Sequence, residues 1–276
     1  MALLQVNFVS SSLKRTVPIQ VILPVDKIFG DADSNADPAP FKTLYLLHGL
    51  LGNYTDWVSN TRIQQWAEAK NLAVVMPSGD NSFYIDQLTP NNDYGNFIGK
   101  ELVEITRKMF PLSRKREDTF IAGLSMGGYG AIRNGLTYGE TFSHIAGLSS
   151  AVYFFETPLD APGRSLMGED RVFGDMRTAM QTNKNPRVAL TQLKERNVSL
   201  PRIYMSCGLQ DRLLEPNRTL KAYFEENGVD VTYEEMEGNH NWDFWNDQIQ
   251  KVLAWLPLDE ATEGLNSGNV QAKPTP

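Results

Sequence analysis

The chain has 276 residues, enough for one large domain or two small ones, and its 41% hydrophobic and 21% charged residues are ordinary for a globular protein. The net charge is −7, and the sequence contains neither a basic patch typical of nucleic-acid binding nor an apolar run of the roughly 20 residues that a membrane helix needs. The single cysteine, Cys207, excludes an intramolecular disulfide and a cysteine-based zinc site, and His48, His144 and His240 are the only imidazoles.

The two ends of the sequence indicate where in the cell the protein is expected and which part of the chain is expected to be disordered. Residues 1–9 lack the basic start, apolar core and cleavage signature of a signal peptide, and together with the lone thiol this favours a cytoplasmic location. Residues 259–276 are polar and have no periodicity, which predicts a disordered tail. We therefore expect the folded part to span residues 1–258.

The predicted elements begin with two alternating strands, 4–8 and 17–23, which suit a hairpin, and a polar loop at 31–40 follows. Further along the chain, a near-continuous apolar run predicts a buried strand at 43–47, and a second buried strand is predicted at 72–76. The alternation continues with predicted strands at 119–124, 145–148, 202–207 and 229–233. Helical spacing predicts helices around 63–67 with Asn60 as the N-cap, at 97–109, from the glycine-rich turn after 124 to about 138, at 218–226 and at 242–255.

This alternation of strands and helices predicts an α/β fold with a mostly parallel central sheet and helices on both faces. In such sheets the active groups gather at the carboxyl ends of the strands. Residues 151–200 break the rhythm, with proline, glycine and polar residues around two weak helical patterns. We interpret that segment as a cap inserted into a single domain.

A nucleophile motif stands between the strand at 119–124 and the next helix. Gly123-Leu124-Ser125-Met126-Gly127 has the form G-x-S-x-G, and its strand–turn–helix setting is the one that a nucleophile elbow requires. Glycines two residues before and after Ser125 avoid clashes in the strained turn. The alternative is a tight turn in which Ser125 only caps the helix.

A serine nucleophile needs a base, and histidine is the usual one. His48 follows a buried strand and is expected to support its loop, while His144 begins a strand and is expected to be packed or at the surface. His240 lies in the polar loop 237–241, between the last strand and the last helix, where it can reach Ser125. We predict His240 as the base; a histidine in a surface loop is the alternative.

The carboxylate that orients the base should follow a strand between the serine and the histidine, because this fold runs in the order Ser, Asp or Glu, His. Asp211 is the first acid after the strand at 202–207, and we predict that it is the orienting acid. Its alternative role is a helix N-terminal acid. Other acids fit this place less well: Asp175, Glu215, Asp230 and Asp243.

An acyl-transfer site also needs two donors for the oxyanion of the tetrahedral intermediate. The backbone N–H of Met126, directly after the nucleophile, is the first predicted donor. The second is the backbone N–H of Leu50, in the glycine-containing loop after the strand at 43–47.

These elements together resemble a known family. They occur in its order as His48-Gly49-Leu50-Leu51-Gly52, Gly123-Leu124-Ser125-Met126-Gly127-Gly128, Asp211 and Gly238-Asn239-His240-Asn241-Trp242. The sequence resembles the α/β-hydrolases of the esterase D group, which includes S-formylglutathione hydrolases, feruloyl esterases and mycolyltransferases, and it is most similar to small bacterial tributyrin esterases. The resemblance covers about residues 1–258 and assigns the same triad and oxyanion donors.

The resemblance implies a serine carboxylesterase that acts on short acyl chains, with a small-molecule ester as its partner and no metal or cofactor. Alternatives are an S-formylglutathione hydrolase-type thioesterase, a feruloyl, cinnamoyl or acetyl-sugar esterase, an acyltransferase and a non-catalytic binding protein. The triad argues against the last of these. The oligomeric state is open, and a homo-oligomer is expected only by analogy with family members.

Overall fold

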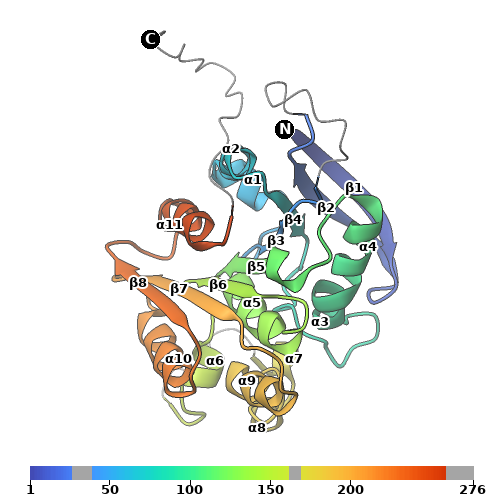
Figure 1. Cartoon of the computed structure of the whole chain (residues 1–276). Coiled ribbons are helices and arrows are strands. Elements are labelled where there is room, and N and C mark those ends of the chain that lie inside the picture. Colours follow the sequence, from blue (N-terminus) through green and yellow to red (C-terminus); the bar gives the residue numbers. More distant parts are fainter. Residues whose placement is uncertain (27–38, 162–168, 259–276) are drawn as a thin grey trace, which may run out of the picture.

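The computed structural model describes residues 1–26, 39–161 and 169–258 (Figure 1). The predicted tail, 259–276, and most of the predicted loop 31–40 lie outside these residues, so both remain predictions.

One mixed sheet organises the described residues, with eight strands in the order β1-β2-β4-β3-β5-β6-β7-β8. The first two strands form an antiparallel hairpin, β2 pairs antiparallel with β4, and every other pairing in the sheet is parallel. The strands are β1 (Ala2–Ser10), β2 (Arg15–Leu23), β3 (Thr43–Leu47), β4 (Ala73–Pro77), β5 (Thr119–Leu124), β6 (His144–Leu148), β7 (Arg202–Gly208) and β8 (Val231–Met236). The predicted α/β fold with a mostly parallel sheet is confirmed.

Side chains of the central strands alternate between two cores. In β3, Leu44 and Leu46 face one core while Tyr45 and Leu47 face the other, and all four are buried. Because a parallel strand is covered on both sides, it carries apolar residues at successive positions. This is why the continuous apolar runs of the sequence predicted the inner strands.

Helices cover both faces of the sheet (Figure 1). One core contains residues of α1, α2 and α11, and the other contains residues of α4, α5, α9 and α10. The helices are α1 (Asp56–Asn60), α2 (Ile63–Ala69), α3 (Tyr94–Asn96), α4 (Leu102–Met109), α5 (Met126–Thr137), α6 (Tyr153–Glu156), α7 (Glu169–Phe173), α8 (Met176–Ala179), α9 (Pro186–Glu195), α10 (Leu214–Glu226) and α11 (Trp242–Trp255), with a π-helical turn at Phe97–Glu101 before α4 and a 3₁₀ turn at Arg116–Asp118.

Two predicted helix starts are wrong. Asn60 does not cap the second helix: it is the last residue of α1, and its side chain donates to the Asp56 carbonyl at 2.9 Å. The second helix, α2, follows Arg62 without a side-chain cap. Likewise α10 begins at Leu214 rather than at residue 218, because its first turn is partly exposed and has no apolar period to mark it.

The described part of 151–200 forms four short helices, α6 to α9, rather than two. An aromatic cluster joins α6 and α7 to the main body of the protein. Phe83 lies 5.3 Å from both Phe154 and Phe173, and the Tyr129 ring stacks on Phe155 at 5.8 Å. These rings tie the segment to the larger core, and its assignment as the cap of a single domain remains a prediction.

Candidate active site

Ser125 occupies a strained turn between β5 and α5. Its φ of 52° and ψ of −116° lie in a region that costs a non-glycine residue about 1–3 kcal/mol. A Cβ at Gly123 would lie 2.3 Å from the Gly127 carbonyl oxygen, and one at Gly127 would lie 2.5 Å from the carbonyl oxygens of Leu47 and His48. Both positions therefore require glycine.

Backbone hydrogen bonds hold this turn against the end of β6. The Ser125 N–H donates to the Leu148 carbonyl at 2.8 Å, and the Ser125 carbonyl accepts from the Ala151 N–H at 3.0 Å. The same carbonyl accepts the Tyr129 N–H at 3.0 Å as α5 begins. These contacts together impose the strained backbone conformation on Ser125, and such strain persists only where the surrounding structure imposes it.

The loops after β7 and β8 lock together through two glycines. A Cβ at Gly208 would lie 2.3 Å from the Gly238 carbonyl oxygen, so the backbones are in close contact. That carbonyl accepts the Gln210 N–H at 3.1 Å, and the Gln210 side chain accepts the Gly238 N–H at 2.8 Å. This contact brings Asp211, from the first loop, beside His240, from the second.

Ser125, His240 and Asp211 form one hydrogen-bonded chain. The distance from His240 Nε2 to Ser125 Oγ is 2.9 Å, and that from His240 Nδ1 to Asp211 Oδ2 is 2.8 Å. The other carboxylate oxygen of Asp211 accepts the Leu213 N–H at 2.9 Å. Because a carboxylate only accepts, the proton between His240 and Asp211 belongs to Nδ1, which leaves Nε2 as the acceptor of the serine proton.

Asp211 is buried and remains ionised. Burial by itself would raise the pKa of this carboxyl, but the hydrogen bonds from His240 and from the Leu213 N–H outweigh it and lower the pKa below its ordinary value. His240 lies at the surface of the site, with 24% of its side chain exposed. The pair thus joins a buried fixed charge to an accessible imidazole.

Tryptophans of α11 support the imidazole from one side; the sequence motif included Trp242 without a role, and Trp245 was not singled out. The Trp245 ring meets His240 edge to face at 4.9 Å, and Trp242 meets Trp245 at 5.4 Å. Trp57 of α1 is 1% exposed and packs on Trp242. Trp242 and Trp245 follow His240 by two and five residues, and this closeness in the sequence would have been the signal.

The remaining histidines and the cysteine have other surroundings. His144 is packed between the rings of Phe120 and Trp255, at 5.4 and 5.1 Å, and burial, followed by nearby arginines, lowers its pKa to about 4. Cys207 is fully buried in β7. His48 is buried beneath the loop after β3. Among the described residues, His240 is the imidazole hydrogen-bonded to Ser125.

Three of the acids that the sequence left as alternatives have partners away from Ser125. Asp175 caps α8 by accepting the Thr178 N–H at 2.9 Å. Glu215 pairs with Arg218 at 2.5 Å, and Asp230 pairs with Arg202 at 2.7 Å. Asp243 is in the first turn of α11.

The two predicted oxyanion donors belong to segments next to Ser125. Met126 is the first residue of α5, where backbone N–H groups have no acceptor within the helix. Leu50 belongs to the loop after β3, and that loop passes next to the serine: a Cβ at Gly49 would lie 3.6 Å from the Ser125 Cβ. Within residues 1–26, 39–161 and 169–258, no group of three or more His, Cys, Asp or Glu side chains is arranged to hold a metal ion, and no helix is long and apolar enough to cross a membrane.

Comparisons with known proteins show the family of this chain. A family model described as "Putative esterase" matches residues 10–256. An acetyl esterase from Caldicellulosiruptor saccharolyticus is 45% identical over 261 residues, which cover 93% of this chain and 98% of that protein.

Two solved structures from Staphylococcus aureus share the fold. FphF, described as a fluorophosphonate-binding serine hydrolase with substrate bound, superposes with a TM-score of 0.79 at 31% identity, over 92% of this chain and 98% of its own. The S-formylglutathione hydrolase FrmB superposes with a TM-score of 0.77 at 29% identity, over the same shares of the two chains. With its fold, matched span and identity to these proteins, the chain belongs to the esterase family of α/β-hydrolases and is a serine hydrolase that acts as a carboxylesterase.

Proposed function

We propose that this esterase hydrolyses short-chain acyl esters through a covalent acyl-enzyme, with Ser125 as the nucleophile, His240 as the base and Asp211 as the acid that orients it. The observation that carries the proposal is the continuous hydrogen-bonded chain from Ser125 Oγ through His240 to Asp211, with links of 2.9 and 2.8 Å. These are the distances and the order that an activated serine requires.

In the first half-reaction, His240 Nε2 takes the proton from Ser125 Oγ as that oxygen attacks the ester carbonyl. The new C–O bond gives a tetrahedral intermediate, whose negative oxygen we assign to the N–H groups of Met126 and Leu50. When the intermediate collapses, the bond to the alcohol breaks and His240 gives its proton to the departing oxygen. The Asp211 carboxylate stabilises the imidazolium in between.

In the second half-reaction, water replaces the alcohol. His240 removes a proton from the water as its oxygen attacks the acyl carbon, and it then returns that proton to Ser125 Oγ as the carboxylic acid forms. The partial exposure of the His240 side chain suits this step, because both the alcohol and the water must reach the imidazole. The cycle needs no cofactor.

An acetyl ester is the substrate class that we favour, since the relative that is 45% identical is named an acetyl esterase. A thioester of the S-formylglutathione type is the second candidate, supported by the name of the FrmB structure. Both acyl groups are small, and both reactions would use the same three side chains.

Two measurements test the proposal. A fluorophosphonate probe should add its mass to the wild-type protein at Ser125, and Ser125→Ala should neither bind the probe nor hydrolyse p-nitrophenyl acetate. Hydrolysis by Ser125→Ala at more than a small fraction of the wild-type rate would overturn the assignment of the nucleophile. Comparing kcat/KM for p-nitrophenyl acetate, butyrate and octanoate with that for S-formylglutathione then identifies the substrate class.

A further inference from the structure

A second imidazole, His48, lies beneath the loop that carries Leu50, and the proposed reaction does not use it. It is 1% exposed and both of its ring nitrogens are hydrogen-bonded. Nδ1 lies 2.7 Å from the Gly49 carbonyl oxygen, and Nε2 lies 2.8 Å from the Gly79 backbone nitrogen.

These two partners determine where the His48 proton is. A carbonyl oxygen only accepts, so Nδ1 must donate to Gly49, and a backbone N–H only donates, so Nε2 must accept from Gly79. His48 is therefore neutral, with its proton on Nδ1. Burial lowers the pKa of this imidazole, although the Gly49 carbonyl and the nearby carboxylates of Asp56 and Asp80 oppose that effect.

The bond from His48 Nδ1 holds the Gly49 carbonyl, which also accepts the Gly52 N–H at 3.2 Å, and it bears on the direction of a neighbouring group. The Gly49 carbonyl and the Leu50 N–H belong to one planar trans peptide, so their bonds point in opposite directions. We propose that His48 is a positioning residue for the oxyanion site: by holding the Gly49 carbonyl, it directs the Leu50 N–H toward the oxyanion formed at Ser125. This inference rests on the proposed function.

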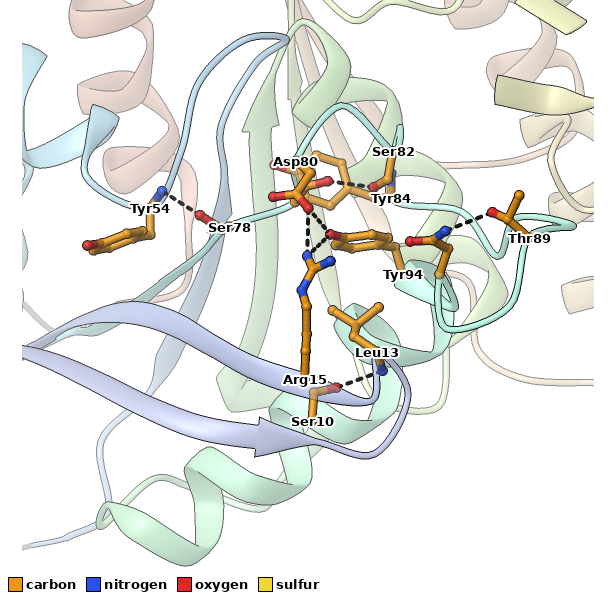
Figure 2. Close-up of polar contacts among 12 residues, drawn as sticks. Ser10, Leu13, Arg15, Tyr54, Ser78, Asp80, Ser82, Tyr84, Thr89 and Tyr94 are labelled. Carbon is orange, nitrogen blue, oxygen red and sulfur yellow. Dashed lines mark hydrogen bonds and ion pairs between the residues drawn. The ribbon is translucent and has the colours of Figure 1, made fainter. Parts of the chain in front are cut away.

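The segment 78–84, after β4, holds the same loop at three further points. The Tyr84 hydroxyl donates to the His48 carbonyl at 2.9 Å, and the Asn81 side chain accepts the Leu51 N–H at 2.8 Å. Ser78 Oγ accepts the Tyr54 N–H at 3.3 Å, as Figure 2 shows. With the Gly79 N–H on His48, four bonds join the two loops, so the loop that carries Leu50 is fixed from one side.

Segment 78–84 is itself anchored to the β1–β2 hairpin. Asp80 accepts from Arg15 at 2.6 Å, and the Tyr94 hydroxyl hydrogen-bonds to both of these side chains (Figure 2). Asp80 and Tyr84 have φ values of 47° and 56°, which non-glycine residues hold only where the surroundings impose them. The segment is thus held by contacts to the hairpin as well as to the loop that carries Leu50.

Two substitutions of His48 separate positioning from space filling. In His48→Asn, the side-chain amide can replace Nδ1 as the donor to Gly49, whereas in His48→Gln the amide can replace only Nε2 as the acceptor from Gly79. Glutamine fills more of the imidazole volume, so a role in packing alone predicts that it is the better substitute. Positioning predicts the opposite order.

We expect His48→Gln to lower kcat for p-nitrophenyl acetate by up to the ~10²–10³-fold that one oxyanion donor contributes, with KM changed less than threefold. His48→Asn should keep at least ten times the kcat of His48→Gln. A trifluoromethyl ketone, whose adduct with the serine carries the oxyanion, should lose affinity in the same order. The matched control is His144→Gln, another buried neutral imidazole, which should keep wild-type kcat.

Wild-type kcat and inhibitor affinity in His48→Gln, or equal losses in both variants, would overturn the inference and leave the proposed function standing. Hydrolysis by Ser125→Ala would overturn the proposed function, and with it the oxyanion role of Leu50. Nitrogen-15 NMR of the wild-type imidazoles tests the inference even where a variant does not fold. His48 should be neutral at pH 7 with its proton on Nδ1, and a proton on Nε2 or a cationic ring would refute the proposal.

Discussion

Replacing Asp211 by asparagine tests the orientation of His240 without changing the shape of the site. The carboxylate receives two donors, the Leu213 N–H at 2.9 Å on Oδ1 and His240 Nδ1 at 2.8 Å on Oδ2. Asparagine has one oxygen and one NH₂ for these two places. Because the Leu213 N–H can only donate, the amide oxygen must turn toward it and the NH₂ must face His240.

The consequence for His240 follows from its two tautomers. Facing an NH₂ group, Nδ1 becomes an acceptor and the ring proton moves to Nε2. An Nε2–H group cannot take the proton of Ser125, so the nucleophile loses its base. In serine triads this change lowers kcat by about 10⁴, which corresponds to about 5.5 kcal/mol of transition-state stabilisation at 1.36 kcal/mol per factor of ten.

The assay is the steady-state hydrolysis of p-nitrophenyl acetate by Asp211→Asn, with circular dichroism and thermal unfolding to show that the fold is retained. Glu215→Gln is the matched control, since it makes the same chemical change on an exposed acid in the first turn of α10. It should stay within threefold of wild type. If Asp211→Asn kept more than a tenth of the wild-type kcat, or if Glu215→Gln were the impaired variant, the assignment of the acid would be wrong.

Two more predictions concern the frame around the site. In Gly127→Ala the new Cβ would meet the carbonyl oxygens of Leu47 and His48 at 2.5 Å. We therefore expect urea titration to show a loss of about 1–3 kcal/mol in the free energy of unfolding, and we expect a lower kcat. Unchanged values would show that the turn tolerates a side chain. Glu101 accepts hydrogen bonds from residues 10–12, and these bonds outweigh its burial and lower its pKa to about 2 from 4.5. The stability that Glu101 contributes is therefore complete above pH 4.5 and is lost as the pH falls toward 2. Glu101→Gln should lower the free energy of unfolding by about 1–2 kcal/mol at pH 7 and by progressively less below pH 4.5, and a difference independent of pH would contradict this explanation.

The sequence predicted the strands of the described sheet because most are either buried on both faces or alternate plainly, as β1 does. It did not predict α1 or the four separate helices of 151–200. Several of these have only four or five residues, too few to show a helical period. Their positions depend on tertiary contacts such as the aromatic cluster around Phe83.

The predicted site residues Ser125, His240 and Asp211 lie together because each follows a strand at the same edge of the sheet. Motif and chain order were enough to choose them. The support around them was beyond sequence reasoning, since Trp245 reaches His240 through the packing of α11, and Gly79 reaches His48 from a different loop. Contacts of that kind depend on how two loops meet in space, which no local pattern records.

The three proposed catalytic side chains come from strands of very different burial. Every residue of β5, which leads to Ser125, is buried, whereas β8, which leads to His240, lies at the end of the sheet and has no fully buried residue. Edge strands with little buried surface open at lower free energy than the centre of a fold. Partial opening of β8 would carry the imidazole away while the nucleophile stayed in place, so in mild denaturant turnover should disappear before the tertiary structure does.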